Sequence, residues 1–334
     1  MPNYIFSESS GLNDSIYGKC QAPIKMFIEQ RGEEFEKKSL LKDLFLMQDV
    51  DNYGNTITGM TSMRGFLPVG ENGAYPSDSM EEGYQKQLNA VTWKDSFAIS
   101  QELIEDAKLM DLKRAPAGFM TSYGRTREKF GAAIYAGAMN GAKTITFGGK
   151  VFDICGADEK PIFSTGHVGK VDKKSQANLF SDEFSAEALD AVETEMHHFK
   201  DDTGEILDLE PDTIVIGDNA VLKRRVFEVI GADKDPVTSN NAFNYQYGRW
   251  NVIIWPYLDQ FLAEGATPWM LMDSKFNQTY GGAVWHDRLK LAVKSTIDDN
   301  TDANVWRGRS RFNATFNDWR FAALGGVVGG KNLV

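Results

Sequence analysis

The chain is short of cysteine: Cys20 and Cys155 are the only two among 334 residues. Two cysteines exclude a disulfide framework and a cysteine-based metal cluster, and two buried, reduced thiols are the simpler interpretation. The sequence also lacks an apolar run long enough to span a bilayer, and it lacks the basic-then-apolar start of a secretory signal. We therefore expect a folded protein made in a cytoplasm, with no membrane partner.

Positive charge is scarce as well. Lysine and arginine total 36 against 47 aspartates and glutamates, which gives a net charge of -11 and a pI near 5.0. A surface that binds nucleic acid is usually basic, because phosphate contacts dominate the affinity. The composition therefore argues against a nucleic-acid-binding protein. A hydrophobic share of 42% is ordinary for a folded chain, and the length allows two or three domains.

Motifs for metals and nucleotides are incomplete. No two of the four histidines have the i, i+4 spacing that holds zinc on a helix. The run from Asp298 opens like a calcium loop, but Ala303 replaces the glycine and Arg309 replaces the bidentate glutamate. The glycines before Lys331 have phosphate-loop spacing, yet Asn332 follows where Ser or Thr is needed, and no helix can follow. We predict no metal and no cofactor.

Catalytic motifs are equally weak. Ser164, His167 and an aspartate could be imagined as a hydrolase triad, but the Gly-x-Ser-x-Gly turn that exposes such a serine is absent. A structural hydrogen bond is the favoured role of His167. The acids from Asp201 to Glu210 and the seven tryptophans leave a carbohydrate-active enzyme open, although that chemistry needs two carboxylates facing across a cleft. A solvated turn is the simpler interpretation, and we predict no catalytic site.

The most informative segment is 201–258, which reads as turn, strand, helix and strand. The strands are expected at 211–216 and 250–255, with an amphipathic helix at 219–230 between them. No obvious catalytic residue lies at either strand end. Such a compact α/β module without an evident site is suited to packing against copies of itself.

The remaining pattern predicts an extended arm, several helices and a hairpin. Helical pieces are expected within 22–47, interrupted at Gly32, and further helices at 100–108, from Pro116 to about Gly141, and at 185–199. Strand-like runs at 61–69 and 84–99 flank a glycine-rich stretch, and a two-stranded hairpin of this kind needs another surface to lie on. Other expected elements are a polar arm over 1–20, a long strand at 305–321 and a glycine-rich tail at 325–334.

Five stretches in this order resemble the major capsid protein of tailed bacteriophages, which has the Hong Kong 97 fold, and most closely its Mu-like major head subunit branch. The stretches are 97–106, 162–167, 201–216, 252–258 and 318–320. The resemblance implies an α+β fold with an axial and a peripheral domain, the latter built on a long spine helix. Its expected divisions are an N-terminal arm (1–60), an extended loop (61–98), a peripheral domain (99–183), an axial domain (184–302), and a return strand with the C-terminal tail (303–334).

The resemblance implies a structural protein and not an enzyme. Copies would assemble as pentamers and hexamers in the host cytoplasm, into the icosahedral virion capsid of a tailed phage that encloses double-stranded DNA without sequence-specific binding. The short polar start at Met1 favours a separate scaffold protein, and portal and decoration proteins are further expected partners. Some family members cross-link subunits through a lysine; Lys86 lies in the corresponding element, but no partner can be assigned and no cross-link is predicted. An encapsulin-type compartment is the first alternative and the carbohydrate-active enzyme the second.

An arginine row, Arg307, Arg309 and Arg311, recurs at every second residue of the long predicted strand, so the three side chains share one face. The opposite, core-facing side would carry Trp306, Phe312 and Phe316. Three like charges in a row repel, and a sheet tolerates them best when acids lie opposite. A solvated strand face is one interpretation of the row.

The other interpretation uses the family geometry, in which the extended loop of one subunit lies over the peripheral domain of the next. The loop here carries Asp78, Glu81 and Glu82. The planar guanidinium of arginine can hold a carboxylate by two hydrogen bonds. We therefore predict an assembly interface in which these acids bind the arginine row of a neighbouring subunit.

Overall fold

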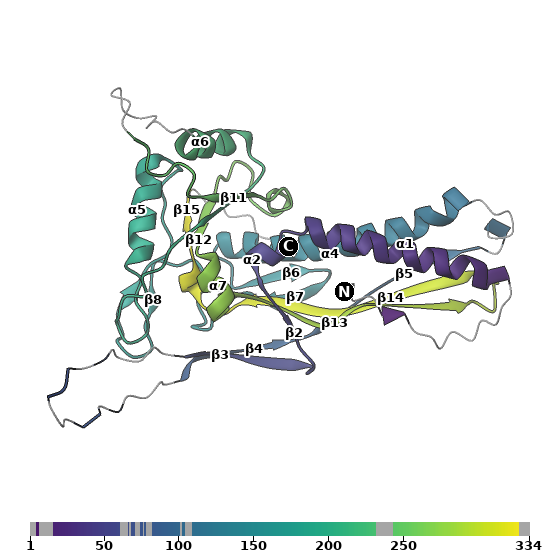
Figure 1. The fold of residues 1–334 in the computed structure, drawn as a ribbon, viewed down its shortest axis with the longest axis horizontal. Helices are drawn as coiled ribbons and strands as arrows, with labels where there is room; N and C mark the ends of the chain where they lie inside the picture. Colours follow the sequence, from purple (N-terminus) through teal and green to yellow (C-terminus); the bar gives the residue numbers. More distant parts are fainter. Residues whose placement is uncertain are drawn as a thin grey trace.

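The computed structural model describes residues 5–6, 16–60, 66, 68–70, 74–75, 77, 82–100, 102–103, 109–231 and 243–326. The described part is elongated (Figure 1). Two long helices lie along a sheet of long strands at one end, and a more compact α/β module forms the other end. A two-stranded hairpin projects from the region between them.

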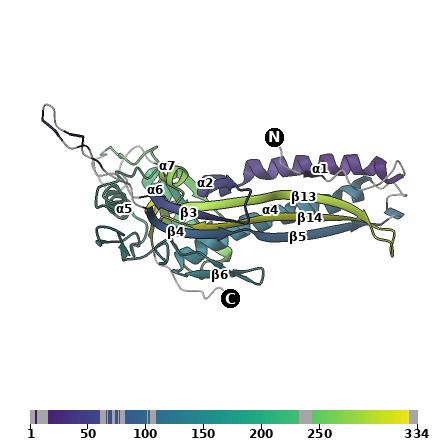
Figure 2. The same cartoon turned by 90° about the horizontal axis from the view of Figure 1, so that it is seen from below.

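The long sheet has the order β1-β13-β14-β5, and β2 also pairs with β13. Its strands are β1 (Ile5–Phe6), β2 (Leu46–Asp49), β5 (Val91–Ile99), β13 (Ala283–Ile297) and β14 (Asn304–Phe316). β14 runs antiparallel to both β13 and β5, whereas β1 and β2 pair with β13 in parallel. One face of this sheet is covered by helix α4 (Leu109–Met139), and helix α1 (Ile16–Lys38) lies beside α4 (Figures 1 and 2).

Both long helices differ from the prediction at one point. α1 continues through Gly32 without interruption, and α4 begins before Pro116, which lies inside the helix. The close approach of the two helices accounts for part of this difference, because packing overrides intrinsic propensity. A Cβ atom on Gly124 of α4 would lie 2.3 Å from the ring of Phe35 on α1, so glycine is what permits this contact. The predicted end of α4 is confirmed: Gly141 follows it with a φ of +70°.

The α/β module contains a four-stranded sheet of order β11-β10-β12-β15. The strands are β10 (Thr213–Ile216), β11 (Asn251–Ile254), β12 (Trp269–Met272) and β15 (Ala322–Gly325), and the flanking helices are α5 (Ala186–His197) and α6 (Ala220–Ile230). β10 and β11 are parallel, as a strand-helix-strand unit requires. The predicted turn, strand, helix and strand are therefore confirmed. The side chains of Ser185 and Asn219 cap the two helices by accepting backbone hydrogen bonds.

Two strands, β13 and β15, belong to other sheets than the predicted domain divisions imply. β13, from within 184–302, is the longest strand of the sheet against α4, and sequence reasoning did not single it out. The predicted strand 305–321 ends at Phe316, where Asp318 caps a short 3-10 turn, Trp319–Phe321. The chain then enters the module sheet as β15. The last segment thus joins the two sheets instead of only returning to the first.

The projecting hairpin consists of β3 (Gly54–Met60) and β4 (Glu82–Asn89). The first strand therefore lies earlier in the chain than the predicted 61–69, most of which is outside the described residues. The predicted run 84–99 divides at Ala90, because β4 pairs with β3 while β5 pairs with β14. The shorter elements are α2 (Leu41–Leu44), β6 (Thr144–Phe147), β7 (Lys150–Asp153), β8 (His167–Val168), β9 (Ser175–Gln176), a 3-10 turn at Leu258–Gln260 and α7 (Ser274–Tyr280).

One hydrophobic core runs through both sheets. It includes Phe130 of α4 and Phe312 of β14 as well as Ile214 and Leu222 of the α/β module. A smaller cluster around Phe119 and Trp306 fills the far end between α1, α4 and the long sheet. The two parts of the molecule therefore share a core and do not have separate ones.

Candidate assembly surface

The predicted alternation along β14 is confirmed. Arg307 and Arg309 are exposed and Arg311 is half-buried, all on the face of the sheet turned away from α4. That face is in front in Figure 2. Trp306, Phe312 and Phe316 are buried on the opposite side. The arginine row thus lies on an ordered sheet, and its outer side is exposed in the described structure.

The strands beside the arginine row add more positive charge. Lys294 of β13 is the register partner of Arg307, and Lys94 of β5 is the register partner of Arg309. Like charges directly opposite each other destabilise a sheet. Within the described residues, no carboxylate forms an ion pair with any of these cations; Arg311 instead places its guanidinium 5.6 Å from the ring centre of Tyr53. We call Lys94, Lys294 and the arginine row the cationic face. The acids expected opposite the row are absent from this part of the sheet.

The predicted acidic partners are not brought to the cationic face by the described structure. Asp78 and Glu81 lie outside the described residues. Glu82 is the first residue of β4, and its side chain is not among those described. Nearby loop residues that are described, Phe66 and Tyr75, are fully exposed. The pairing of these acids with the arginine row stays a prediction.

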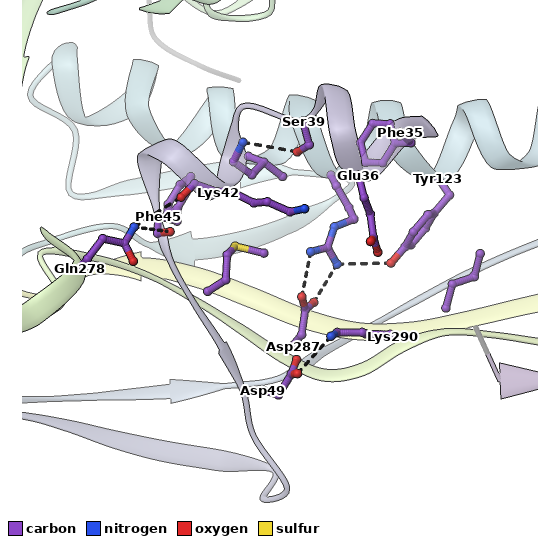
Figure 3. A pocket seen from close by; sticks show the side chains of 14 residues that line it. Phe35, Glu36, Ser39, Lys42, Phe45, Asp49, Tyr123, Gln278, Asp287 and Lys290 are labelled. Atoms are coloured by element: carbon purple, nitrogen blue, oxygen red, sulfur yellow. Dashed lines mark hydrogen bonds and ion pairs between the residues drawn. The ribbon is translucent and has the colours of Figure 1, made fainter. Parts of the chain in front are cut away.

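A buried ion pair that sequence reasoning missed joins α4 to β13. The two terminal nitrogens of Arg127 donate to the two carboxylate oxygens of Asp287 at 2.7 and 2.8 Å. Burial alone would lower the pKa of Arg127, but Tyr123 and Asp287 outweigh it and the net direction is upward. The pair borders a cavity of about 390 Å³ between α1, α4, β2 and β13 (Figure 3). Asp287 already satisfies the guanidinium, so the pair fastens the helix to the sheet.

The neighbouring residue, Glu128, connects three segments. One carboxylate oxygen accepts hydrogen bonds from the hydroxyl of Ser39 at 2.6 Å and the backbone N–H of Leu40 at 3.2 Å, at the junction of α1 and α2. The other oxygen accepts from the indole N–H of Trp255, just after β11, at 3.2 Å. Burial raises the pKa of Glu128 above its usual value. This carboxylate holds the N-terminal helix, the long helix and the α/β module in a fixed relation.

His167 has the predicted structural role. The ring is fully buried, stacks on Trp319 at 4.4 Å, and places Nδ1 2.6 Å from a carboxylate oxygen of Asp158. The other ring nitrogen lies 3.2 Å from the side-chain oxygen of Asn178, whose amide nitrogen donates to three backbone carbonyls. The hydroxyl of Ser164 accepts from the backbone N–H of Gly166. His167 therefore ties three segments together and has no bond to Ser164 that would make a triad.

The acidic turn is only partly solvated, contrary to the prediction. Asp201 and Asp202 are buried, and Asp202 accepts a hydrogen bond from Arg320 at 2.9 Å. Asp201 accepts backbone hydrogen bonds from the turn that follows it. Buried carboxylates need such partners, and both of these have them within the fold. The Asp298 turn is confirmed as an Asx turn, since its carboxylate accepts from the backbone N–H of Asn300.

Metal and thiol chemistry finds little support in the described part. No group of three or more His, Cys, Asp or Glu side chains is placed to hold a metal ion among the described residues. Cys155 is buried and free, and burial raises its pKa to about 11, which keeps the thiol protonated. None of the described helices is long and apolar enough to cross a membrane.

Comparison with solved structures found similar chains among phage capsids and an encapsulin. Mycobacterium phage Patience matches with a TM-score of 0.49 and 10% identity, over 99% of this chain and 94% of that one. The capsid of Ralstonia phage GP4 matches with a TM-score of 0.48 and 10% identity, over 88% and 90%. The holo-SrpI encapsulin complex from Synechococcus elongatus PCC 7942 matches with a TM-score of 0.49 and 10% identity, over 86% of each chain.

The comparison with curated proteins found no match. A profile of the phage capsid protein family, however, matches residues 83–324, well over half of the chain. The matched range begins in the projecting hairpin and ends in β15, so it includes the long helix α4, the module sheet and the long sheet except β1 and β2. The match confirms the predicted resemblance to phage capsid proteins, and the two sheets with their helices confirm the α+β fold. The protein is thus a structural subunit of a phage capsid. The chain belongs to the phage capsid protein family.

Proposed function

We propose that this major capsid protein assembles as pentamers and hexamers into the icosahedral head of a tailed phage, around double-stranded DNA. The observation that carries the proposal is the family match over residues 83–324. The architecture supports it, since a hairpin that projects from the body has surface to offer a second copy. The net charge of -11 suits a shell whose wall does not bind the packaged genome tightly.

The α/β module, within the predicted axial division 184–302, would surround each local symmetry axis, and the long sheet with α4 would form the rim. A ring requires head-to-tail contacts between two different surfaces of each copy. The module offers exposed charges on both helices: Glu187 and Glu195 on α5, and on α6 Arg224 beside Arg225, which already pairs with Glu183 at 2.6 Å. Such complementarity favours one relative orientation of neighbours.

The cationic face would receive the acidic extended loop of a neighbouring subunit. Repulsion between Arg309 and Lys94 across the sheet is relieved once carboxylates lie above it. The hairpin that carries the loop projects on the same side of the long sheet as the cationic face (Figure 1). Each exposed pair would contribute only about 0.2 to 1 kcal/mol, but the contacts repeat over every subunit of a shell.

Charge reversal tests this interface. Arg309→Glu should weaken assembly, and adding Glu81→Lys with Glu82→Lys should partly restore it. Lys150→Glu, an exposed reversal on β7, is the matched control because it changes the net charge equally and lies off the cationic face. If the combined variant assembles no better than Arg309→Glu alone, the loop does not bind the arginine row.

Assembly itself is tested by negative-stain microscopy of the purified chain, which should show shells or capsomer rings. Small separate particles at all concentrations would contradict a self-assembling subunit. The encapsulin alternative is weaker than the phage interpretation, and the contents of particles from infected cells decide it: DNA supports a phage head and enzymes support a compartment. Portal and decoration proteins would copurify with such heads, and a separate scaffold protein would be needed for uniform shells formed in the host cytoplasm.

A further inference from the structure

The hairpin of β3 and β4 is attached to the body mainly through one side of β4. Along this strand, Gln85 and Gln87 are exposed, whereas Lys86 and Leu88 are buried and Tyr84 is half-buried. Two strands alone are marginally stable in water, so the side that faces the body must fix the hairpin. What that side contacts determines the direction in which β3 and β4 project from the body.

Lys86 is the first attachment. Its side chain is only 8% exposed, and its ammonium group donates a hydrogen bond to the backbone carbonyl of Cys155. A carboxylate oxygen of Asp153, at the end of β7, lies 3.3 Å from the same nitrogen. One charged group of the hairpin is therefore held by two groups of the segment 153–155, which are not part of the hairpin.

Lys170 is the second attachment, and here the lysine belongs to the body. Its ammonium group donates to the backbone carbonyl of Gly83 at 2.9 Å and lies 5.8 Å from the ring centre of Tyr84. The backbone N–H of Lys170 donates to Asp202, which is itself bound by the buried Arg320. The anchor is thus continuous from the first residues of β4 to the core of the protein.

The contacts of Lys86 and Lys170 are suited to fixing the position of the hairpin on the body. Burial lowers the pKa of Lys86 despite the opposing effect of Asp153, so the contact weakens the charge that it uses. A buried apolar side chain would hold the hairpin without the cost of burying a charge. An apolar contact has no direction, however, and would let the strand shift along the body. A hydrogen bond from an ammonium group to a single carbonyl fixes both position and direction.

We propose that Lys86 and Lys170 aim the extended loop, so that it leaves each subunit in the direction needed to reach a neighbour. They act through the hairpin and not at the contact between subunits. The inference rests on the proposed assembly function of the loop. It adds the residues on which that function depends inside a single copy.

The test uses Lys86→Met and Lys170→Met in the full chain. Lys174→Met is the matched control, since Lys174 is an exposed lysine on the same connection as Lys170. Lys170→Arg should restore the contact, because arginine also donates to a carbonyl. Spin labels at Tyr75→Cys on the loop and Glu187→Cys on α5 report the loop direction. The background carries Cys20→Ser and Cys155→Ala, and the latter keeps the carbonyl that Lys86 binds.

Both methionine variants should broaden the distribution of label distances in the unassembled protein, and each should raise the concentration needed for assembly by at least about tenfold. The control and Lys170→Arg should match the parent chain in both measurements. If Lys86→Met does not fold, the test uses Lys170→Met alone, because Lys170 is only half-buried. An unchanged distance distribution, or a broadened one with normal assembly, overturns the proposal.

Failure of this inference can be separated from failure of the proposed function. A variant in which residues 71–81 are replaced by a Gly-Ser linker keeps both lysine contacts and removes the loop. If it forms normal shells, the loop has no role in assembly, whatever the lysine variants do. If it forms none while the lysine variants assemble normally, the loop is needed but these lysines do not aim it.

Discussion

Lys94 on β5 lies directly opposite Arg309 on β14, on the open face of the long sheet. Like charges in register cost stability in a single copy, and the described residues supply no carboxylate between them. An unfavourable contact in the isolated subunit becomes favourable only when another molecule brings negative charge. Under the proposed interface, this contact affects both the stability of one copy and the assembly of many, and mutation can separate the two effects.

Lys94→Glu should affect stability and assembly in opposite directions. The new carboxylate faces Arg309 across the sheet, so the unassembled chain should gain about 0.2 to 1 kcal/mol in its free energy of unfolding. The same change reduces the positive charge available to a neighbour and should raise the concentration needed for assembly. Urea unfolding and sedimentation measure the two effects. If stability and the tendency to assemble both rise, or both fall, the role of the cationic face is contradicted.

Removing one partner of the Arg127–Asp287 ion pair should lower stability much more than replacing both partners together. Arg127→Met or Asp287→Leu alone leaves a buried charge without its partner and should lower the free energy of unfolding by about 3 to 5 kcal/mol. The double variant removes both charges and should cost clearly less than the sum. A double-mutant cycle by urea unfolding measures this coupling. Additive effects would mean that the pair does not act as a unit.

Glu128 should give stability a particular dependence on pH. Because burial raises its pKa, the folded state favours the protonated form, so its contribution is fully present below the unfolded pKa near 4.5 and is lost as pH rises through the folded pKa. Glu128→Gln cannot titrate. Its free energy of unfolding should therefore improve relative to the parent chain as pH rises above the unfolded pKa near 4.5. Glu33→Gln, exposed on α1, is the control. A difference that does not change with pH would contradict the assignment.

Two glycines of α4 should respond oppositely to the same substitution. Gly124→Ala places a methyl group against Phe35 and should destabilise the chain by about 1 to 3 kcal/mol. Gly118→Ala meets nothing within 4 Å and should stabilise the helix by about 0.5 to 1 kcal/mol. Thermal unfolding of both variants gives the comparison. Loss of stability at Gly118 as well would show that backbone freedom, and not the contact with α1, is what α4 requires.

Local patterns in the sequence predicted what local interactions determine. The alternation of the arginine row follows from strand geometry alone, and the helices predicted at 185–199 and 219–230 follow from the apolar periodicity of those residues. The strand-helix-strand order of the α/β module is equally local. The family resemblance then supplied what these patterns could not, namely that copies of the module assemble.

Contacts between distant segments escaped prediction. Arg127 and Asp287 are separated by 160 residues, and Lys86 and Cys155 by 69, so no spacing in the sequence connects them. The helix boundaries at Gly32 and Pro116 were wrong for the same reason. Their intrinsic preferences are local, whereas the helices are held by packing of α1 on α4 and of α4 on the sheet. Asp287 stands between His286 and Arg288 in β13, so its sequence neighbours offered no signal of a buried pair.

The shared core has a mechanical consequence. β13 spans 15 residues, and the residues from Trp285 to Ile297 reach about 40 Å beyond the core that contains Trp285. The smaller cluster around Phe119 and Trp306 holds the far end, so the long sheet and the helices on it form one arm whose base lies beside the α/β module. A rotation of about 5° at the base moves a tip at that distance by about 3.5 Å. In the proposed shell, small angular changes at the base would then be enough to adjust a contact at the far end of the long sheet, without deforming either sheet.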